Sequence, residues 1–476
     1  MSTRARVVIV GGGFTGLTAA YKLSQDERFS VTLLEAGQEL GGLAGGFRML
    51  GTSLEKTYHH IFQTDNHILE LAEELGLSKE LMWRDSSLGV YLGGRTYPFT
   101  TALDLLRFKP CGLLGRLRLG LVALYLKHKS DWRALASEPA HRWMLRACGP
   151  AAMATVWTPL LKAKFGLYYE SVSMAWLWGR IHIRAHSRGK GGRGEKLGYF
   201  RGGFATVVRR LQDELARRGC GIETGKRVER FAVAGVQASA RPRVCSPPFR
   251  VSGFVTAPDT LKGGLQTLDK LKLELQLVGG ETIPFDYCIF TGSCPALARL
   301  LPPGGEFAEY GRQLRAINYL GAVCLVFASE QDLGDYYWLN INEPNAPFLV
   351  FINHTRFIDR SHYQGKHVYY IGAYLPEDDP LFTMEDDALT KLWFDYLRRM
   401  FPEFEPARVL ERHLFHFKAA QHIADTRYLE KIPAYRTPLP GVFLANFAQV
   451  FPEERATNFA VREGLKIALT LSKSVK

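Results

Sequence analysis

A strand that runs directly into a glycine-rich turn and a helix is the feature that most constrains how this chain folds. Residues 7–10 form a continuous apolar run, Gly11, Gly13 and Gly16 follow at GxGxxG spacing, and residues 31–35 form a second apolar run. Short apolar runs of this kind are typical of strands buried on both faces of a parallel sheet. The segment therefore predicts a βαβ unit within an α/β fold.

The three glycines suit the backbone of a dinucleotide-binding turn. Gly11 permits the tight turn after the strand, Gly13 lets the backbone approach a pyrophosphate, and Gly16 lets the helix pack closely on the strand. Phe14 and Thr15 open the helix, whose free N–H groups attract phosphate. The turn therefore predicts a cofactor site that involves all five residues.

An acid and a second pair of glycines narrow the choice of cofactor. Glu35 ends the second strand, where its carboxylate can accept hydrogen bonds from a ribose diol, which favours FAD or NAD over NADP. Ala36 follows directly, and the pair Gly41 and Gly42 precedes Leu43. In this order the segment resembles the flavin amine oxidase, protoporphyrinogen oxidase and phytoene desaturase superfamily, in which a glycine pair lines FAD. That superfamily often has arginine where Leu43 stands.

Two later segments resemble the same superfamily. Residues 199–229 are similar to its return into the FAD domain, where the backbone at Val228 contacts the adenine side. Residues 444–458 resemble its C-terminal motif, in which the closing helix directs its N-terminus at the flavin pyrimidine. The resemblance implies cofactor contacts in this motif at Asn446, Arg455, Thr457 and Asn458. No cysteine follows Cys324, so cysteinyl attachment near this motif is excluded and non-covalent FAD is expected.

The resemblance implies an α/β fold of two domains with the flavin at their interface. The Rossmann-like FAD-binding domain would be discontinuous and comprise residues 1–65, 195–295 and 430–476. The second domain, with a mixed sheet and helices, would comprise residues 66–194 and 296–429 and bind a small-molecule substrate. These patterns leave the oligomeric state open.

Polar side chains near the expected flavin are the candidates for catalysis. His59 and His60 could hydrogen-bond flavin or substrate or move a proton near pH 7, and a structural turn is the alternative interpretation. Lys164 lies close to aromatic residues, and Arg180 and Arg184 are one helical turn apart. These cations could hold an anionic substrate, whereas an ion-paired surface helix is the alternative.

Periodicity in the rest of the chain predicts further elements. Apolar spacing indicates helices over residues 66–76, 204–218, 385–400 and 457–472. Strands are expected over residues 319–328, 347–352 and 367–375. A hairpin is expected across Gly279 and Gly280, and the glycine-rich residues 187–203 predict a loop.

A surplus of basic residues limits the partners of this chain. The chain has 60 Lys and Arg against 47 Asp and Glu, a net charge of +13. Nucleic acid, an anionic membrane or an anionic small molecule would each suit that surplus, and scattered surface cations that keep the protein in solution are the alternative. The basic residues gather over 107–129 and 180–210. No nucleic-acid partner is predicted, because residues 187–203 lack interleaved aromatic side chains before Tyr199.

Residues 98–129 combine leucines with arginines and lysines in a stretch that is predicted to be helical. They resemble the membrane-facing lid helices of phytoene desaturase relatives. One interpretation is a helix that lies in a membrane interface and admits a lipid. The other is a cap helix buried on the substrate domain, with its arginines extending to water.

The seven cysteines are scattered, without the spacing of a metal site or a disulfide framework. We therefore expect reduced thiols, no metal, and a cytoplasmic protein that is either free or peripheral on the inner membrane face. Neither a signal peptide nor a membrane-spanning helix is predicted from the sequence.

These features predict an enzyme in which FAD accepts a hydride from a C–H bond. The resemblance implies desaturation, or oxidation of an amine or porphyrinogen, with a lipophilic or anionic substrate. An alternative is an enzyme like UDP-galactopyranose mutase, a related flavoprotein that acts on a nucleotide sugar without net oxidation. A non-catalytic flavoprotein is disfavoured because every FAD motif is intact.

Overall fold

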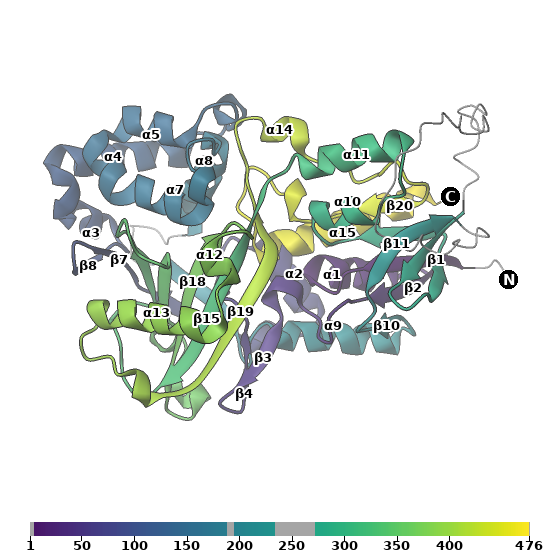
Figure 1. The fold of residues 1–476 in the computed structure, drawn as a ribbon, viewed down its shortest axis with the longest axis horizontal. Helices are drawn as coiled ribbons and strands as arrows, with labels where there is room; N and C mark the ends of the chain where they lie inside the picture. Colours follow the sequence, from purple (N-terminus) through teal and green to yellow (C-terminus); the bar gives the residue numbers. More distant parts are fainter. Residues whose placement is uncertain (1–3, 188–194, 234–271, 476) are drawn as a thin grey trace, which may run out of the picture.

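Three groups of elements make up the structure. A computed structural model of the chain describes residues 4–187, 195–233 and 272–475. Figure 1 shows a group around a parallel sheet on the right, a group around a mixed sheet at the lower left, and a group of helices at the upper left. The chain passes between the groups several times, so segments far apart in sequence lie within one group.

The parallel sheet contains the N-terminal strand at its centre, in the order β10-β2-β1-β14-β20, and every neighbouring pair is parallel. Its strands are β1 (Ala5–Val10), β2 (Phe29–Leu34), β10 (Gly221–Glu223), β14 (Tyr287–Phe290) and β20 (Val442–Leu444). Helix α1 (Phe14–Leu23) joins β1 to β2, so the predicted βαβ unit is confirmed. Val7, Val8 and Ile9 are all buried, because both faces of β1 are covered.

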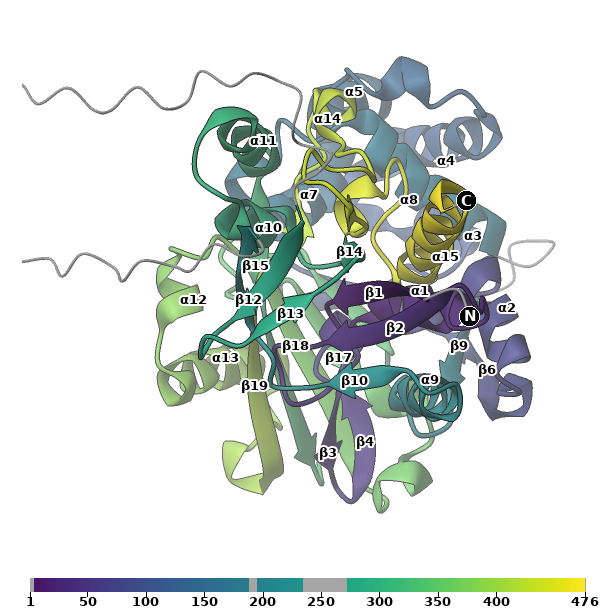
Figure 2. The same cartoon turned by 90° about the vertical axis from the view of Figure 1, so that its right-hand side faces the viewer.

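Helix α15 (Thr457–Ser474) packs against α1 and against α2 (Asn66–Glu74), and α9 (Ala205–Arg217) also packs on α1 (Figure 2). Gly464 permits the close contact of α15 with α1, since a Cβ there would lie 2.6 Å from the carbonyl oxygen of Thr15. The four helices predicted from apolar spacing are confirmed, with ends within two residues of the prediction.

The second sheet has the order β19-β15-β18-β17-β16-β7-β8 and is mixed, because β7 pairs with β16 in parallel and the other neighbours are antiparallel. Its strands are β7 (Leu88–Leu92), β8 (Arg95–Pro98), β15 (Tyr319–Ser329), β16 (Trp338–Ile341), β17 (Val350–Asn353), β18 (His367–Leu375) and β19 (Val409–His422). Helix α13 (Asp386–Met400) packs on the sheet through Leu389 and Trp393. The predicted α/β class with a second, mixed sheet is confirmed.

The third group consists of helices that the chain forms between β8 and β9. Its helices are α3 (Ala102–Arg107), α4 (Gly112–His128), α5 (Ala140–Cys148), α6 (Pro150–Ala152), α7 (Thr158–Phe165) and α8 (Met174–Ser187). The stretch that the sequence suggests is helical divides into α3 and α4 at buried Phe108. The indole N–H of Trp178 donates to the Lys129 carbonyl at 2.9 Å and ties α8 to the end of α4.

Shorter elements complete the fold. They are β3 (Gly46–Met49), β4 (Thr52–Glu55), β5 (Ile61–Phe62), β6 (Leu81–Ser86), β9 (Glu195–Phe200), β11 (Val228–Val233), β12 (Leu273–Leu277), β13 (Thr282–Pro284), α10 (Cys294–Leu300), α11 (Gly305–Arg315), α12 (Pro380–Thr383) and α14 (Tyr428–Lys431). The hairpin between β12 and β13 is confirmed, and Gly279 and Gly280 turn it with φ angles of 103° and 90°.

The predicted loop over residues 187–203 is wrong in its second half. Residues 188–194 lie outside the described residues, but β9 pairs with both β5 and β6. Leu197 and Tyr199 are buried on this strand. The surrounding glycines obscured a short alternating pattern in the sequence.

The contact between α15 and α1 supplies a test of the fold. We expect Gly464→Ala to lower the free energy of unfolding by about 1–3 kcal/mol, because the added methyl group would overpack the helix contact. Gly120→Ala on α4 is the matched control, since nothing lies within 4 Å of its Cβ position. That control should gain up to about 1 kcal/mol from helix propensity. Urea unfolding of both variants measures the difference, and equal stabilities would contradict the assigned contact.

Candidate active site

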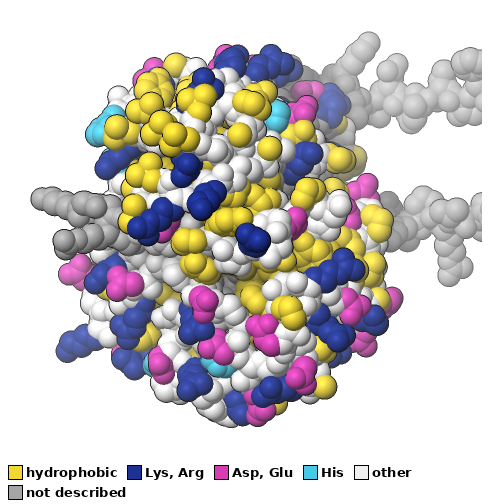
Figure 3. Space-filling model, turned by 90° about the vertical axis from the view of Figure 1, so that its left-hand side faces the viewer, with side chains coloured by type: hydrophobic (Ala, Val, Ile, Leu, Met, Phe, Trp, Pro, Cys, Tyr) yellow, Lys and Arg dark blue, Asp and Glu magenta, His cyan; other side chains and the backbone are white. Residues whose placement is uncertain are grey.

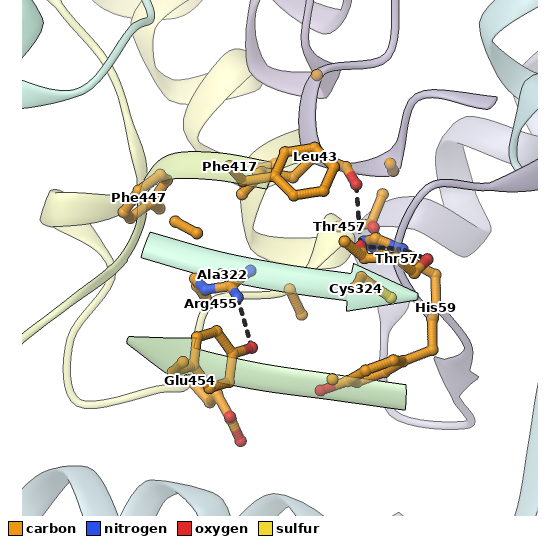
Figure 4. Close-up of a pocket in the computed structure, with 18 of the residues that line it drawn as sticks. Leu43, Thr57, His59, Ala322, Cys324, Phe417, Phe447, Glu454, Arg455 and Thr457 are labelled. Carbon is orange, nitrogen blue, oxygen red and sulfur yellow. Dashed lines mark hydrogen bonds between the residues drawn. The ribbon is translucent and has the colours of Figure 1, made fainter. Parts of the chain in front are cut away.

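A cavity of about 510 Å³ lies where the three groups meet. Its lining includes Gly13 after β1, Thr291 after β14, Cys324 on β15, Lys164 on α7 and Arg180 on α8. Figure 4 shows Arg455 and Glu454 on one side of this cavity, with His59 and Thr57 on the other. The cavity therefore connects the glycine turn of the parallel sheet with the inner face of the mixed sheet.

The two glycine segments found in the sequence lie against each other at one end of the cavity. Gly13 forms an isolated parallel bridge with Gly41, and a Cβ on Gly42 would lie 3.1 Å from the Gly13 Cα atom. Gly11, Gly41 and Gly42 have φ angles of 112°, 112° and 59°, which residues with a side chain rarely adopt. This part of the wall is bare backbone, so a phosphate group can approach it closely.

Glu35 lies beside this wall and has capacity for further hydrogen bonds. Its Oε2 atom accepts from the Gly12 N–H and its Oε1 atom from the Gly37 N–H, each at 2.7 Å. A carboxylate offers about four lone-pair sites. Two hydroxyl groups, such as those of a ribose, can therefore still donate to Glu35.

Two helix N-termini open onto the same cavity. Helix α1 begins at Phe14 after Gly13, helix α15 begins at Thr457 after Ala456, and neither has a side-chain cap. These four residues line the cavity. The uncapped N–H groups offer two sites of partial positive charge. Together with the glycine wall and Glu35, they fit an extended dinucleotide such as FAD.

Most of the predicted cofactor residues come together here. Those that line the cavity are Gly11, Gly13, Phe14, Thr15, Glu35, Gly41, Gly42, Leu43, Arg455 and Thr457. Gly16, Ala36, Val228, Asn446 and Asn458 are not among the lining residues. Gly16 instead supports the turn, because a Cβ there would lie 1.9 Å from the Gly11 carbonyl oxygen.

The two asparagines of the C-terminal motif hold neighbouring elements together. The Asn446 amide donates to the Gly292 carbonyl at 2.7 Å, which joins the ends of β20 and β14. The Asn458 oxygen accepts from the Ile68 N–H at 3.2 Å, which joins α15 to α2. Val228 pairs with Leu277 in the sheet of β11 and β12, and its adenine contact remains a prediction.

His59 and His60 both line the cavity as neutral rings. The His59 Nδ1 atom lies 2.8 Å from the Thr57 carbonyl, and the His60 Nδ1 atom lies 3.1 Å from the Tyr337 hydroxyl. Burial and Arg455 lower the pKa of His59 to about 4, and burial and Arg184 lower the pKa of His60 to about 3. Both rings can therefore accept hydrogen bonds at pH 7, but neither holds a proton to donate as an imidazolium.

Lys164 and Arg180 meet on one carboxylate. The Lys164 ammonium and the Arg180 guanidinium each form an ion pair with one oxygen of Glu454. Although burial raises it, Arg180 and Lys164 hold the pKa of Glu454 well below its usual range. Gly179 allows this meeting, because a Cβ there would lie 2.5 Å from the Pro452 carbonyl oxygen.

The ion-paired interpretation of α8 is thus correct for Arg180, but the helix is not a surface helix. Trp176 and Trp178 are buried, and Arg180 points into the cavity wall. Arg184 also lines the cavity one turn further along α8. The cations that the sequence singled out are therefore in place to face a ligand.

Tyr374 is a further functional candidate, which the sequence did not single out. Its hydroxyl accepts from the Arg455 Nη2–H at 2.7 Å, and the Lys164 Nζ atom lies 5.1 Å from its ring centre. Burial raises the pKa of Tyr374, but Arg455 and Lys164 outweigh this and lower it below the ordinary phenol value. The Tyr374 hydroxyl therefore loses its proton more readily than an ordinary phenol.

The position of Tyr374 in the site becomes clear only from the register of β18 in the structure. Tyr370, Gly372 and Tyr374 alternate along β18 and share one face of the sheet. Gly372 makes room for Tyr58, since a Cβ there would lie 2.9 Å from the Tyr58 ring. Tyr58 and Tyr374 come from distant parts of the chain, and their hydroxyls interact.

The cavity wall formed by Lys164, Arg180, Arg455 and Glu454 contains more positive than negative charges. Lys164, Arg180 and Arg455 carry three positive charges and Glu454 one negative charge, a net charge of +2 at pH 7. Within residues 4–187, 195–233 and 272–475, Arg455 forms no salt bridge. Charges interact more strongly in a partly buried cavity than in water. The wall therefore attracts an anion and repels a cation.

The described residues show neither a disulfide nor a metal-binding cluster. Six cysteines are free, and Cys245 lies outside the described residues. No group of three His, Cys, Asp or Glu side chains in the described part of the chain could hold a metal ion. Cys324 lines the cavity, and burial raises the pKa of its thiol well above the usual value. It is therefore no thiolate at pH 7.

Solved structures with the same fold span nearly the whole chain. A protein from Exiguobacterium sp. 255-15, provisionally named a protoporphyrinogen oxidase, matches with a TM-score of 0.71 and 17% identity over all of both chains. Putrescine oxidase bound to putrescine matches with a TM-score of 0.67 and 14% identity, over 99% of each chain. Reduced UDP-galactopyranose mutase matches with a TM-score of 0.69 and 14% identity, over 99% of this chain and 96% of the other.

Curated relatives match over shorter segments. Amine oxidase [flavin-containing] B of Bos taurus is 31% identical over 136 residues, which is 28% of this chain and 24% of that protein. The enzyme of the same name from Homo sapiens is 36% identical over 100 residues, 21% of this chain and 19% of that protein. The matched segments thus span about a quarter or less of these relatives.

A family profile covers most of the chain. The profile described as flavin containing amine oxidoreductase matches residues 14–242 and 265–449, which include the second glycine pair, His59, His60 and the strands of the mixed sheet. Because the match extends over far more than half of the sequence, the chain belongs to the flavin-containing amine oxidoreductase family.

Proposed function

We propose that the protein is a FAD-dependent oxidoreductase that removes a hydride from a C–H bond of a small anionic substrate. The observation that carries the proposal is the +2 wall of Lys164, Arg180, Arg455 and Glu454, which lies in the same cavity as the dinucleotide features. The family membership supports the oxidation, and the charge of the wall supports the substrate class.

In this proposal FAD is held without a covalent bond by the two glycine turns and the two helix N-termini. The α1 N-terminus and Gly13 would bind the pyrophosphate, Glu35 the ribose, and the α15 N-terminus the flavin pyrimidine. Residues 1–65, 195–295 and 430–476 would form the FAD-binding domain. The remaining residues, 66–194 and 296–429, would bind the substrate.

Bound FAD would supply the hydride acceptor. The residues of the chain orient the substrate and take up the proton that it loses. Arg455 donates to the Tyr374 hydroxyl and lowers its pKa, and the phenolate form of Tyr374 would accept that proton. The neutral rings of His59 and His60 accept hydrogen bonds from the opposite side.

The charge of the wall separates this proposal from the amine substrates of the family name. A cationic amine such as putrescine would be repelled by this wall, which already has a net charge of +2. An anionic group that enters the cavity instead loses its hydration water and gains contacts with the cations of Lys164 and Arg455. Mutase-like isomerisation of a nucleotide sugar is the less favoured function, because the family profile is that of an oxidoreductase.

The cofactor prediction is tested by acid precipitation. We expect the flavin to remain in the supernatant with the mass of FAD, because no cysteine follows Cys324 in the chain and burial raises the pKa of the Cys324 thiol in the cavity. Glu35→Gln should weaken FAD binding about tenfold, because a charge-assisted hydrogen bond to the ribose is lost. Glu39→Gln is the control, since Glu39 is exposed and forms a surface ion pair with Lys56. A yellow pellet, or equal affinities of both variants, would contradict the proposed binding.

The substrate class is tested with a matched pair of small ligands. We expect benzoate to perturb the visible flavin spectrum at lower concentration than benzylamine, which has the same ring and the opposite charge. Arg180→Gln should weaken benzoate binding about tenfold or more, because the wall loses one of its positive charges. Arg146→Gln on α5 should leave it unchanged, since Arg146 is exposed and pairs with Glu138. Tighter binding of benzylamine would refute the anionic substrate class.

The role of Tyr374 is tested by ultraviolet titration of tyrosinate. A phenol whose pKa is lowered loses its proton at lower pH, so the wild-type protein should gain tyrosinate absorbance before its other tyrosines ionise. Tyr374→Phe should remove this early component. Tyr97→Phe on β8 is the control, because Tyr97 packs on Phe108 and does not line the cavity. An unchanged early component in Tyr374→Phe would assign it to another group.

A further inference from the structure

The outward face of α4 is a stripe of exposed leucines. Leu113, Leu117, Leu121 and Leu124 are 67%, 49%, 68% and 55% exposed, and their spacing places them on one side of the helix. The opposite side of α4 is buried. An ordinary surface helix has one apolar face, which packs on the core, and a polar face toward water.

Helix α3 extends the stripe into a patch. Leu103 and Leu106 are each 51% exposed. The Arg116 guanidinium donates to the carbonyls of Leu106 and Gly112 and so holds α3 beside the start of α4. Eight of the fifteen large hydrophobic side chains that are exposed among the described residues lie within residues 103–125. Such a concentration marks a binding surface rather than scattered exposure.

The charges around the patch are almost all positive. Residues 102–129 contain six Lys and Arg and one Asp, a net charge of +5 out of the +13 of the whole chain. Figure 3 shows hydrophobic side chains gathered over the upper half of this face with Lys and Arg among them. Acidic side chains are concentrated in the lower half of the same face.

An aromatic pair lies at the end of the stripe. Tyr125 on α4 stacks on Trp143 on α5 with ring centres 6.2 Å apart, and the Lys129 ammonium lies 5.8 Å from the Tyr125 ring. Tyrosine and tryptophan rings with nearby lysine are typical of the boundary between lipid and water.

We propose that the face formed by α3 and α4 docks on the surface of a bilayer that contains anionic lipid. The leucine stripe enters the acyl boundary, and the surrounding cations contact the lipid phosphates. A second copy of this chain is the poorer occupant, because a two-fold interface would bring two faces of charge +5 together. None of the described helices is long and apolar enough to cross a bilayer.

Docking would place the membrane next to the catalytic cavity. Helix α4 packs on α8, and the cavity side of α8 carries Arg180 and Arg184. The docking surface and the cavity therefore share a wall of helices. The docking proposal does not depend on the proposed chemistry, because it concerns the far side of that wall.

Vesicle co-sedimentation of the intact protein tests the docking surface. We expect binding to vesicles of phosphatidylcholine with phosphatidylglycerol, weaker binding to phosphatidylcholine alone, and loss of binding at high salt. Leu117→Gln with Leu121→Gln should weaken binding about 100-fold, since each buried leucine contributes roughly tenfold. Leu469→Gln on α15, where Leu469 is 56% exposed and remote from the patch, should leave binding unchanged.

A second variant covers the case in which the leucine substitutions disturb folding. Arg107→Gln with Arg118→Gln keeps every leucine and should lower affinity for anionic vesicles roughly fivefold per cation, without affecting neutral vesicles. Absence of wild-type binding to anionic vesicles, or equal loss in Leu469→Gln, overturns the proposal. A dimer in sedimentation velocity that the two leucine substitutions abolish would assign the face to self-association instead.

Discussion

The half-buried carboxylate of Glu454 forms the ion pairs on which the arrangement of the site depends. It pairs with Lys164 on α7 and with Arg180 on α8, and so joins the helical group to the segment that leads into α15. Removal of this carboxylate would leave two partly buried cations unpaired, at a cost of about 3–5 kcal/mol. Such a pair adds little net stability compared with apolar packing, but it specifies how the helices sit against the parallel sheet.

The residue after Glu454 links the same segment to the opposite wall. Arg455 donates to Tyr374 on β18 and to Gln421 at the end of β19, and Thr457 then begins α15. Two adjacent side chains thus contact the helical group and the mixed sheet in turn. Since α15 is itself packed on α1, the two uncapped helix N-termini and the cation wall are held in one geometry. The cavity is therefore organised before any ligand enters it.

Features that depend on local sequence were predictable, and features that depend on register were not. The glycine turn and Glu35 can be recognised from the sequence because their spacing reflects one turn and one strand. Tyr58 and Tyr374 meet only because β18 places Gly372 opposite Tyr58, a contact between segments more than 300 residues apart that carries no local signal. The role of Asn458 shows the converse, since it lies within a predicted cofactor motif but holds α15 to α2.

Helix α4 shows why its surface could not be assigned from sequence alone. Its buried stripe, which includes Leu119 and Leu126, and its exposed stripe, which includes Leu117 and Leu121, are both apolar. The helix therefore has no polar face that would orient it, and periodicity cannot distinguish a buried cap from a docking surface. Packing decides, because α5 and α8 cover one stripe and leave the other to solvent. Two sets of cations within the basic surplus of the chain thus have different surroundings. Lys164, Arg180 and Arg455 line the cavity, whereas the cations of residues 102–129 surround exposed leucines.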